Sequence, residues 1–251
     1  MSNPERMLPK MCEDRGCHLV YAIKAGSHLY GTTTPESDED FGGVFIPGKK
    51  ALLGFHAIDA ISGAGSEPDI MIHEIRKFVQ LCMKGNPNIL DYLFAPDDCV
   101  LVVSRSFSPI LAVRDKFLSR LIAPRFGGYV RGHLSRMERG VTRHLGDKRK
   151  ADIEKHGYST KNGSHLIRLA RMGCEAVETG QYNVRRADAD ELLSIRRGEW
   201  DAARIKEEGL RLVARMDAAV LTSPLPEKPP EAAIEDLVMR TLLQEVRMWN
   251  E

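Results

Sequence analysis

The chain has 251 residues, a formal net charge of +1, 43% hydrophobic residues and 28% charged residues. These values are ordinary for a globular protein, and the length allows one large domain or two smaller ones. A net charge so close to zero creates no overall field toward nucleic acid or a membrane. Any basic binding surface therefore has to be local.

The cysteines indicate a protein of a reducing compartment. There are five, an odd number, and none forms a C-x-x-C pair, which excludes a regular disulfide framework and a zinc knuckle. The first residues, MSNPERMLPKMCEDRG, lack the apolar core of a signal peptide. No apolar run approaches the ~20 residues needed to cross a bilayer. We therefore predict a cytoplasmic protein without a membrane segment.

The first hundred residues mix strand and helix patterns. Short β-rich runs at 17–23, 41–46 and 69–75 predict three strands. Apolar residues at i, i+3, i+4 and i+7 then predict an amphipathic helix over 75–84 that ends at Gly85. Asn86 and Pro87 are typical of the start of a second helix.

From residue 107 the pattern becomes helical. The predicted helices are 107–122, 125–145, 161–179, 188–196, 199–220 and 231–248, with the proline-rich connector SPLPEKPPE before the last. The sequence thus predicts an α+β fold with a small mixed sheet, followed by an α-helical C-terminal domain. We place a catalytic core at 1–106 and a helical domain at 107–251.

The stretch AGSHLYGTTTPESDEDFGG, residues 25–43, combines a Gly-Ser turn with two closely spaced carboxylates. Gly26 allows close approach of the backbone to a ligand, and Ser27 can donate to phosphate oxygens. If a strand begins at Asp38, then Asp38 and Asp40 point to the same side. Such a like-charged pair is best tolerated around Mg²⁺, which also leaves positions for phosphate oxygens.

A third carboxylate would complete this arrangement, and three acids lie near the next predicted strand. Asp69 opens that strand and is the favoured choice, with Glu67 and Glu74 as alternatives. Glu74 lies at the junction of strand and helix, where capping of the helix is its expected role.

The motif G-S-H-x-Y-G-T-x-x-P-x-S-D-x-D resembles the signature of the polymerase-β nucleotidyltransferase superfamily, in its bacterial and phage branch associated with RNA repair. The segments RKFVQLCMKGNPNILDYLF, GYSTKNGSHLIRL and VRRADADELLSIRRGEW resemble further segments of that branch, in order, so the resemblance spans residues 20–200. Glu39 departs from the pattern, because the branch more often has an apolar residue between the two acids.

The resemblance implies a polymerase-β-like sheet and a reaction that uses an NTP and Mg²⁺ in a two-metal site, with Mn²⁺ as a substitute. Gly26 and Ser27 would hold the triphosphate. Asp38, Asp40 and Asp69 would be the catalytic, metal-binding acids.

The predicted helix 161–179 carries a polar stripe of Lys161, His165 and Arg168 at i, i+4 and i+7. A solvated face is the plain interpretation. The matching family segment favours contacts between these three residues and the triphosphate, in a cleft between the two halves. Tyr158 is open to base stacking or to a structural role. The arginines 185, 186, 196 and 197 are open to contacts with an acceptor backbone or to a solubilising role.

We therefore predict a nucleotidyltransferase that moves an NMP from an NTP to an acceptor hydroxyl and releases pyrophosphate. The expected acceptor is an RNA 3′ end, with tRNA favoured. The alternatives are an enzyme that transfers AMP to a protein and a non-catalytic NTP-binding regulator.

Overall fold

The computed structural model describes residues 3–63, 68–139 and 147–248, without the side chains of 147–149 and 248. The described chain divides into two compact units. Unit 1 comprises the residues up to Met83, Asn88–Phe117 and the segment from Pro229, and unit 2 comprises Lys84–Pro87 and Leu118–Lys228. Each unit is described by itself.

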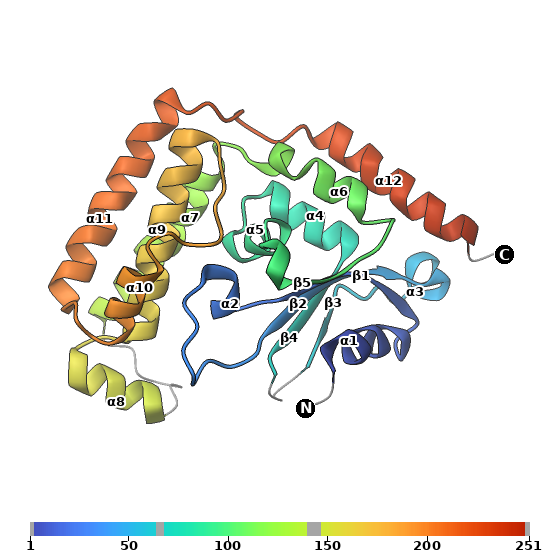
Figure 1. Ribbon diagram of the computed structural model, residues 1–251. Helices are drawn as coiled ribbons and strands as arrows, with labels where there is room; N and C mark the ends of the chain where they lie inside the picture. The colour runs from blue at the N-terminus through green and yellow to red at the C-terminus, as the bar shows by residue number, and fades with distance from the viewer. Residues whose placement is uncertain (1–2, 64–67, 140–146, 249–251) are drawn as a thin grey trace. The chain divides into compact units, whose positions relative to one another are not determined.

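Unit 1 is built on a five-stranded sheet with the order β3-β4-β2-β1-β5 (Figure 1). The strands are β1 (Cys17–Lys24), β2 (Phe41–Pro47), β3 (Ala60–Ser62), β4 (Ile70–Glu74) and β5 (Val100–Val103). β2 pairs antiparallel with β1 and parallel with β4, so the sheet is mixed. This arrangement confirms the predicted α+β class.

Helices cover both faces of this sheet. They are α1 (Pro4–Glu13), α2 (Ser27–Tyr30), α3 (Lys49–Leu53), α4 (Ile75–Met83), α5 (Pro87–Leu93), α6 (Ser108–Ala112) and α12 (Glu231–Met248). On one face, Leu8 and Cys12 of α1 pack in a buried cluster with Phe41, Ile70 and Ile72 of the sheet. α4 contacts β2 and β4, and α12 contacts α4 and α6.

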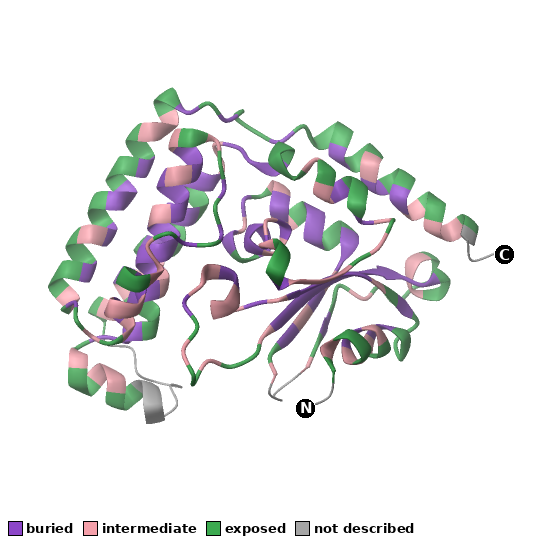
Figure 2. Cartoon of the chain, in the orientation of Figure 1, coloured by how far each residue is buried: buried purple, intermediate pink, exposed green. Residues whose placement is uncertain are grey.

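Unit 2 consists of helices around α9 (Thr160–Thr179). The others are α7 (Ile122–Glu138), α8 (Asp147–His156), α10 (Ala189–Arg196) and α11 (Ala202–Ala219). α9 contacts all four, and most of its residues are buried (Figure 2). Gly173 allows the close approach of α11, because a β-carbon there would lie 2.7 Å from the terminal methyl carbon of Met216.

The boundary between the units differs from the predicted one. Residues 107–117 and α12 belong with the sheet, not with the helical unit, because their apolar residues, such as Phe107 and Ile110, are buried in unit 1. The helix expected over 107–122 is broken into α6, a 3₁₀ turn at Arg114–Phe117 and the start of α7.

Among the described residues, no helix is both long enough and apolar enough to cross a bilayer.

Candidate active site

Asp40 and Asp69 lie level with each other, immediately before two neighbouring parallel strands. Phe41 of β2 is paired in register with Ile70 of β4, and the Phe41 amide donates a 2.8 Å hydrogen bond to the Asp69 carbonyl. Since Phe41 and Ile70 belong to the core beneath α1, the residues that precede them point to the opposite face. The sheet register therefore brings these two carboxylates to the same end and the same face of the sheet.

The Gly-Ser turn reaches the same place from β1. The Ala25 amide donates a 2.7 Å hydrogen bond to the Asp40 carbonyl, which extends the pairing of β1 and β2 by one residue. Gly26 then adopts a φ of 64°, in the region that favours glycine. A β-carbon on Gly26 would overlap Oδ2 of Asp40. The turn therefore requires glycine both for its backbone conformation and for the space that the carboxylate occupies.

A pocket with a volume of about 190 Å³ opens at this point. Its lining combines the two carboxylates, the glycine turn and side chains of α5. The lining residues are Ala25, Gly26, Tyr30, Asp40, Phe41, Asp69, Met71, Asn88 and Tyr92. Three of the residues predicted from the sequence, Gly26, Asp40 and Asp69, thus share one pocket.

Two tyrosines shape the wall of this pocket. The Tyr30 hydroxyl donates a 2.7 Å hydrogen bond to Oδ2 of Asp91, which is completely buried on α5. The ring of Tyr92 lies against the α-carbon of Gly42, where a β-carbon would overlap the ring. The segment NPNILDYLF contains this wall, but its role depends on a long-range contact with β2 that the sequence pattern alone does not reveal.

Asp38 and Ser27 do not line the pocket. β2 begins at Phe41, where the strand 41–46 was predicted to begin, so the condition that a strand starts at Asp38 is not met and strand alternation does not align Asp38 with Asp40; Asp38 is exposed. Ser27 is the first residue of the short helix α2. Both residues are neighbours of pocket residues in the sequence. Ser27 follows Gly26 directly, and Asp38 comes two residues before Asp40.

Glu39, the departure from the family pattern, forms an ion pair. Its Oε1 lies 2.8 Å from Nζ of Lys24, and this hydrogen bond lowers the pKa of Glu39. Its negative charge is therefore offset by a neighbouring cation on β1.

Of the two alternatives to Asp69, Glu74 has the capping role that was predicted. Its Oε2 accepts a 3.0 Å hydrogen bond from the Lys77 amide in the first turn of α4, and its Oε1 lies 2.8 Å from Nε of Arg76. Glu67 lies outside the described residues.

The pocket fits a divalent cation with a phosphate ligand. Mg²⁺ is commonly held by one or two carboxylates together with substrate phosphates and water, and Asp40 and Asp69 supply two carboxylates beside a glycine turn open to a phosphate. Within the described residues, no three His, Cys, Asp or Glu side chains form a ready-made metal cage. The donor set thus suits a metal that binds together with its substrate.

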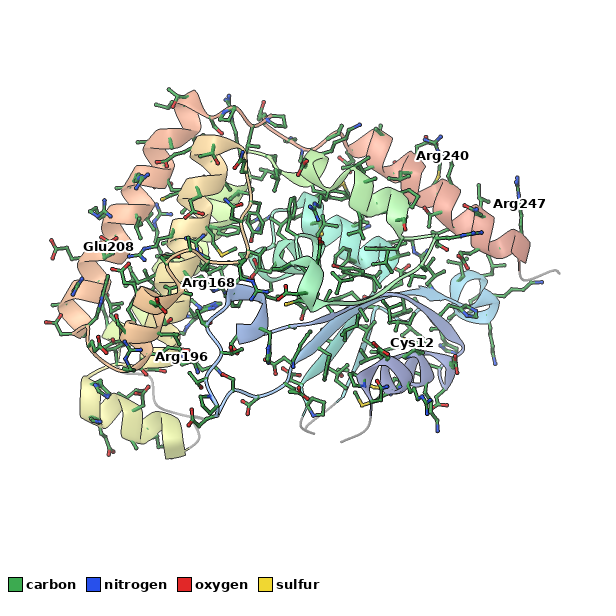
Figure 3. All side chains as sticks on the ribbon, in the orientation of Figure 1. Cys12, Arg168, Arg196, Glu208, Arg240 and Arg247 are labelled. Atoms are coloured by element: carbon green, nitrogen blue, oxygen red, sulfur yellow. The ribbon has the colours of Figure 1, made fainter. Side chains whose placement is uncertain are left out.

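The predicted polar stripe lies on α9 in unit 2. Lys161 is exposed, His165 is half-buried and Arg168 is only 4% exposed; Figure 3 labels Arg168 on α9. Nη2 of Arg168 lies 2.9 Å from Nδ1 of His165. Because a guanidinium only donates, Nδ1 is the acceptor and the imidazole is neutral. Burial, and then the charge of Arg168, lower the pKa of His165 to about 3, so His165 contributes no positive charge at neutral pH.

Two further predictions for unit 2 are resolved in favour of structural roles. Tyr158 is buried and its hydroxyl donates a 2.8 Å hydrogen bond to the Trp200 carbonyl, so its ring is not available to a base. Arg186 is buried and lies 2.6 Å from Glu175 and 2.8 Å from Asp188. Arg186 is therefore part of the packing between α9 and α10.

Comparison with known proteins places the chain in a family. The sequence profile of the RNA repair pathway DNA polymerase beta family, RlaP, matches residues 3–240. The chain is 35% identical over 85 residues to an uncharacterized 38.9 kDa protein of Enterobacteria phage T4, which covers 30% of this chain and 25% of that protein. It is 30% identical over 91 residues to the uncharacterized protein YcgL of Bacillus subtilis, which covers 34% of each.

These matches to the curated relatives span a quarter to a third of those proteins' lengths. A crystal structure of a nucleotidyltransferase-like protein from Exiguobacterium sibiricum is also similar. It has a TM-score of 0.31 and 7% identity, and the similarity covers 88% of this chain and 75% of that one. The family profile, in contrast, extends over nearly the whole sequence and confirms the resemblance found in the motifs. The chain belongs to the RNA repair pathway DNA polymerase beta family.

Proposed function

We propose that this protein transfers a nucleoside monophosphate from an NTP to an acceptor hydroxyl at the 3′ end of an RNA such as tRNA. The observation that carries the proposal is the contact of Gly26 with Asp40 in the pocket that Asp69 shares. A backbone turn whose amides can donate to phosphate oxygens thus lies directly against Asp40, in a pocket that Asp69 also lines. The family description supports RNA as the acceptor class.

The reaction is an in-line substitution at phosphorus. The acceptor oxygen forms a bond to the α-phosphorus while the bond from that phosphorus to the bridging oxygen breaks, and pyrophosphate leaves with the bonding electrons. The proton of the acceptor hydroxyl passes to solvent. Asp40 and Asp69, joined by Asp38 from the preceding loop, would hold divalent cations, Mg²⁺ or Mn²⁺. Bound there, these ions supply charge neutralisation and a lowered pKa of the attacking hydroxyl.

The residues of the turn orient the triphosphate. The Gly26 backbone and the Ser27 hydroxyl would donate hydrogen bonds to its β- and γ-phosphate oxygens. Contacts of Lys161, His165 and Arg168 on α9 with the triphosphate stay a prediction from the sequence. The five described cysteines are buried thiols outside any disulfide, which supports a reducing compartment such as the cytoplasm.

The test is incubation of the purified protein with Mg²⁺, each α-labelled NTP in turn and total tRNA. Asp40→Asn is the matched control, because it removes the charge and keeps the shape of the side chain. We expect nuclease-sensitive label with the native protein alone, and a single preferred NTP. If protease removes the label and nuclease does not, the acceptor is a protein and not RNA. If no label appears although the protein still binds NTP, the protein is a non-catalytic nucleotide-binding protein.

A further inference from the structure

The pocket has a neutral polar side that the phosphate and metal roles leave unused. Asn88 and Tyr92 are four residues apart on α5, so they lie on the same face of the helix, and both line the pocket. Asp40 and Asp69 provide the charged side. An amide and a phenol hydroxyl that share a pocket with two carboxylates suit a neutral polar group of the substrate, not another phosphate.

Tyr92 is held in place by two contacts from the sheet. Its ring lies against Gly42 of β2, and its carbonyl accepts a 2.9 Å hydrogen bond from the Tyr21 hydroxyl of β1. The phenol is also close to the charged side. Burial, followed by the negative charges of Asp69, Asp91 and Asp40, raises the pKa of Tyr92 to about 12. Because Tyr92 lines the same pocket as Asp40 and Asp69, its hydroxyl is a pre-positioned donor and acceptor there.

The group that must lie beside the reacting phosphate is a sugar. The α-phosphate of an NTP is attached to its own ribose, and the attacking hydroxyl of an RNA end belongs to a terminal ribose. Both sugars bring neutral hydroxyl groups within reach of the carboxylates that bind the metal. A site that hydrogen-bonds such a hydroxyl rejects the analogue that lacks it, because the polar groups of the site are then left unpaired.

Building on the proposed function, we propose that Asn88 and Tyr92 bind a ribose hydroxyl next to the reacting phosphate and so select ribose over 2′-deoxyribose. This assigns α5 the role of a sugar-recognition element. The hydroxyl comes either from the nucleotide or from the RNA end, and two arms of one experiment distinguish these sources.

The first arm compares kcat/KM for the preferred NTP and its 2′-deoxy form, with Mg²⁺ and a fixed RNA acceptor. The second compares acceptors that end in ribose and in 2′-deoxyribose, with the NTP fixed. In one of these arms, Tyr92→Phe should reduce the ribose preference about tenfold, the value of one hydrogen bond. The substitution should lower kcat/KM for the ribose substrate and leave kcat/KM for the 2′-deoxyribose substrate unchanged. Asn88→Ala should act in the same arm.

Tyr129→Phe is the matched control. It removes the phenol hydroxyl of an exposed residue of α7 that does not line the pocket, so the ribose preference should be unchanged. An equal effect of Tyr92→Phe on both sugars in both arms, or no effect in either, overturns the sugar-recognition role.

A separate binding measurement distinguishes this inference from the function on which it rests. Calorimetry gives the affinity of the native protein and of Tyr92→Phe for ATP and 2′-deoxyATP, and for short RNAs that end in ribose or in 2′-deoxyribose. If the native protein transfers no nucleotide, the proposed function fails, and these affinities decide the inference. A preference for the ribose form of either ligand that Tyr92→Phe abolishes supports it, and equal affinities of the native protein for the two forms of both ligands refute it.

Discussion

The hydroxyl of Tyr30, on the helix that follows the Gly-Ser turn, is hydrogen-bonded over 2.7 Å to the carboxylate of Asp91 on α5. The bond joins the turn to the wall of the pocket, and its acceptor is completely buried. We expect Tyr30→Phe to lower the free energy of unfolding by about 1–2 kcal/mol, because a buried acceptor loses a donor. Urea unfolding measures this. Tyr129→Phe, on an exposed residue of α7, is the control and should leave the midpoint unchanged.

Gly26→Ala should abolish most activity without unfolding the protein. A methyl group there overlaps Oδ2 of Asp40, so the carboxylate or the turn has to move, and the positive φ adds strain. Displacement of a reacting group by an ångström costs roughly 100-fold in rate. Gly128→Ala, on α7 with no heavy atom within 4 Å of the added methyl, is the control and should keep full activity. Equal rates for the two variants would contradict the role of the turn.

Substitution of Asp69 should lower the activity, and substitution of Glu74 should lower the stability. Asp69→Asn removes a carboxylate of the pocket, and we expect a loss of about 100-fold or more in transfer rate with little change in thermal midpoint. Glu74→Gln weakens the cap of α4 and should lower stability by about 1 kcal/mol while transfer continues. Parallel rate and melting measurements test both. The reverse pattern would make Glu74 the third acid.

Gly42→Ala should act through Tyr92. The added methyl overlaps the ring, and overpacking of this kind costs about 1–3 kcal/mol. In a double-mutant cycle, the cost should become much smaller in a Tyr92→Ala background, since the ring that clashes is gone. Additive costs in the cycle would show that Gly42 is required for another reason.

His165 should make the protein less stable in acid. Its pKa is lowered to about 3 in the folded chain, so the unfolded chain binds the extra proton first, near its ordinary pKa of about 6.5. The stability is therefore highest above pH 6.5 and declines as the pH falls toward 3. His165→Gln should flatten this part of the profile of unfolding free energy against pH. A profile identical to that of the native protein would contradict the neutral, half-buried imidazole.

The sequence predicted the strands that position the site and missed those at its margins. β1, β2 and β4 correspond to the β-rich runs bounded by glycine, proline or charged residues, and all three were predicted within two residues. β3 and β5 are the edge strands, with three and four residues. Such short, half-exposed strands lack a periodic pattern, because pairing with the inner strands defines them.

Within the site, sequence proximity was a weaker guide than strand register. Asp38 and Asp40 are adjacent in the motif, yet Asp40 shares the pocket with Asp69, which is 29 positions further along, because β2 and β4 are paired in parallel. The place of Tyr92 in the pocket could not be predicted from the sequence for a similar reason. Its position depends on the missing side chain of Gly42, and a pattern within one segment does not reveal a contact between two segments.

The assignment of α12 to unit 1 has a consequence for biosynthesis. The strands of the sheet leave the ribosome early, but α12, which packs on α4 and α6, is translated only after all of unit 2. The nascent catalytic unit thus exposes the apolar surface of these two helices while more than one hundred further residues, 118–228, are made. Completion of the pocket-bearing unit is therefore tied to synthesis of the helical one, and a transcript broken between the two would yield a sheet without its last helix.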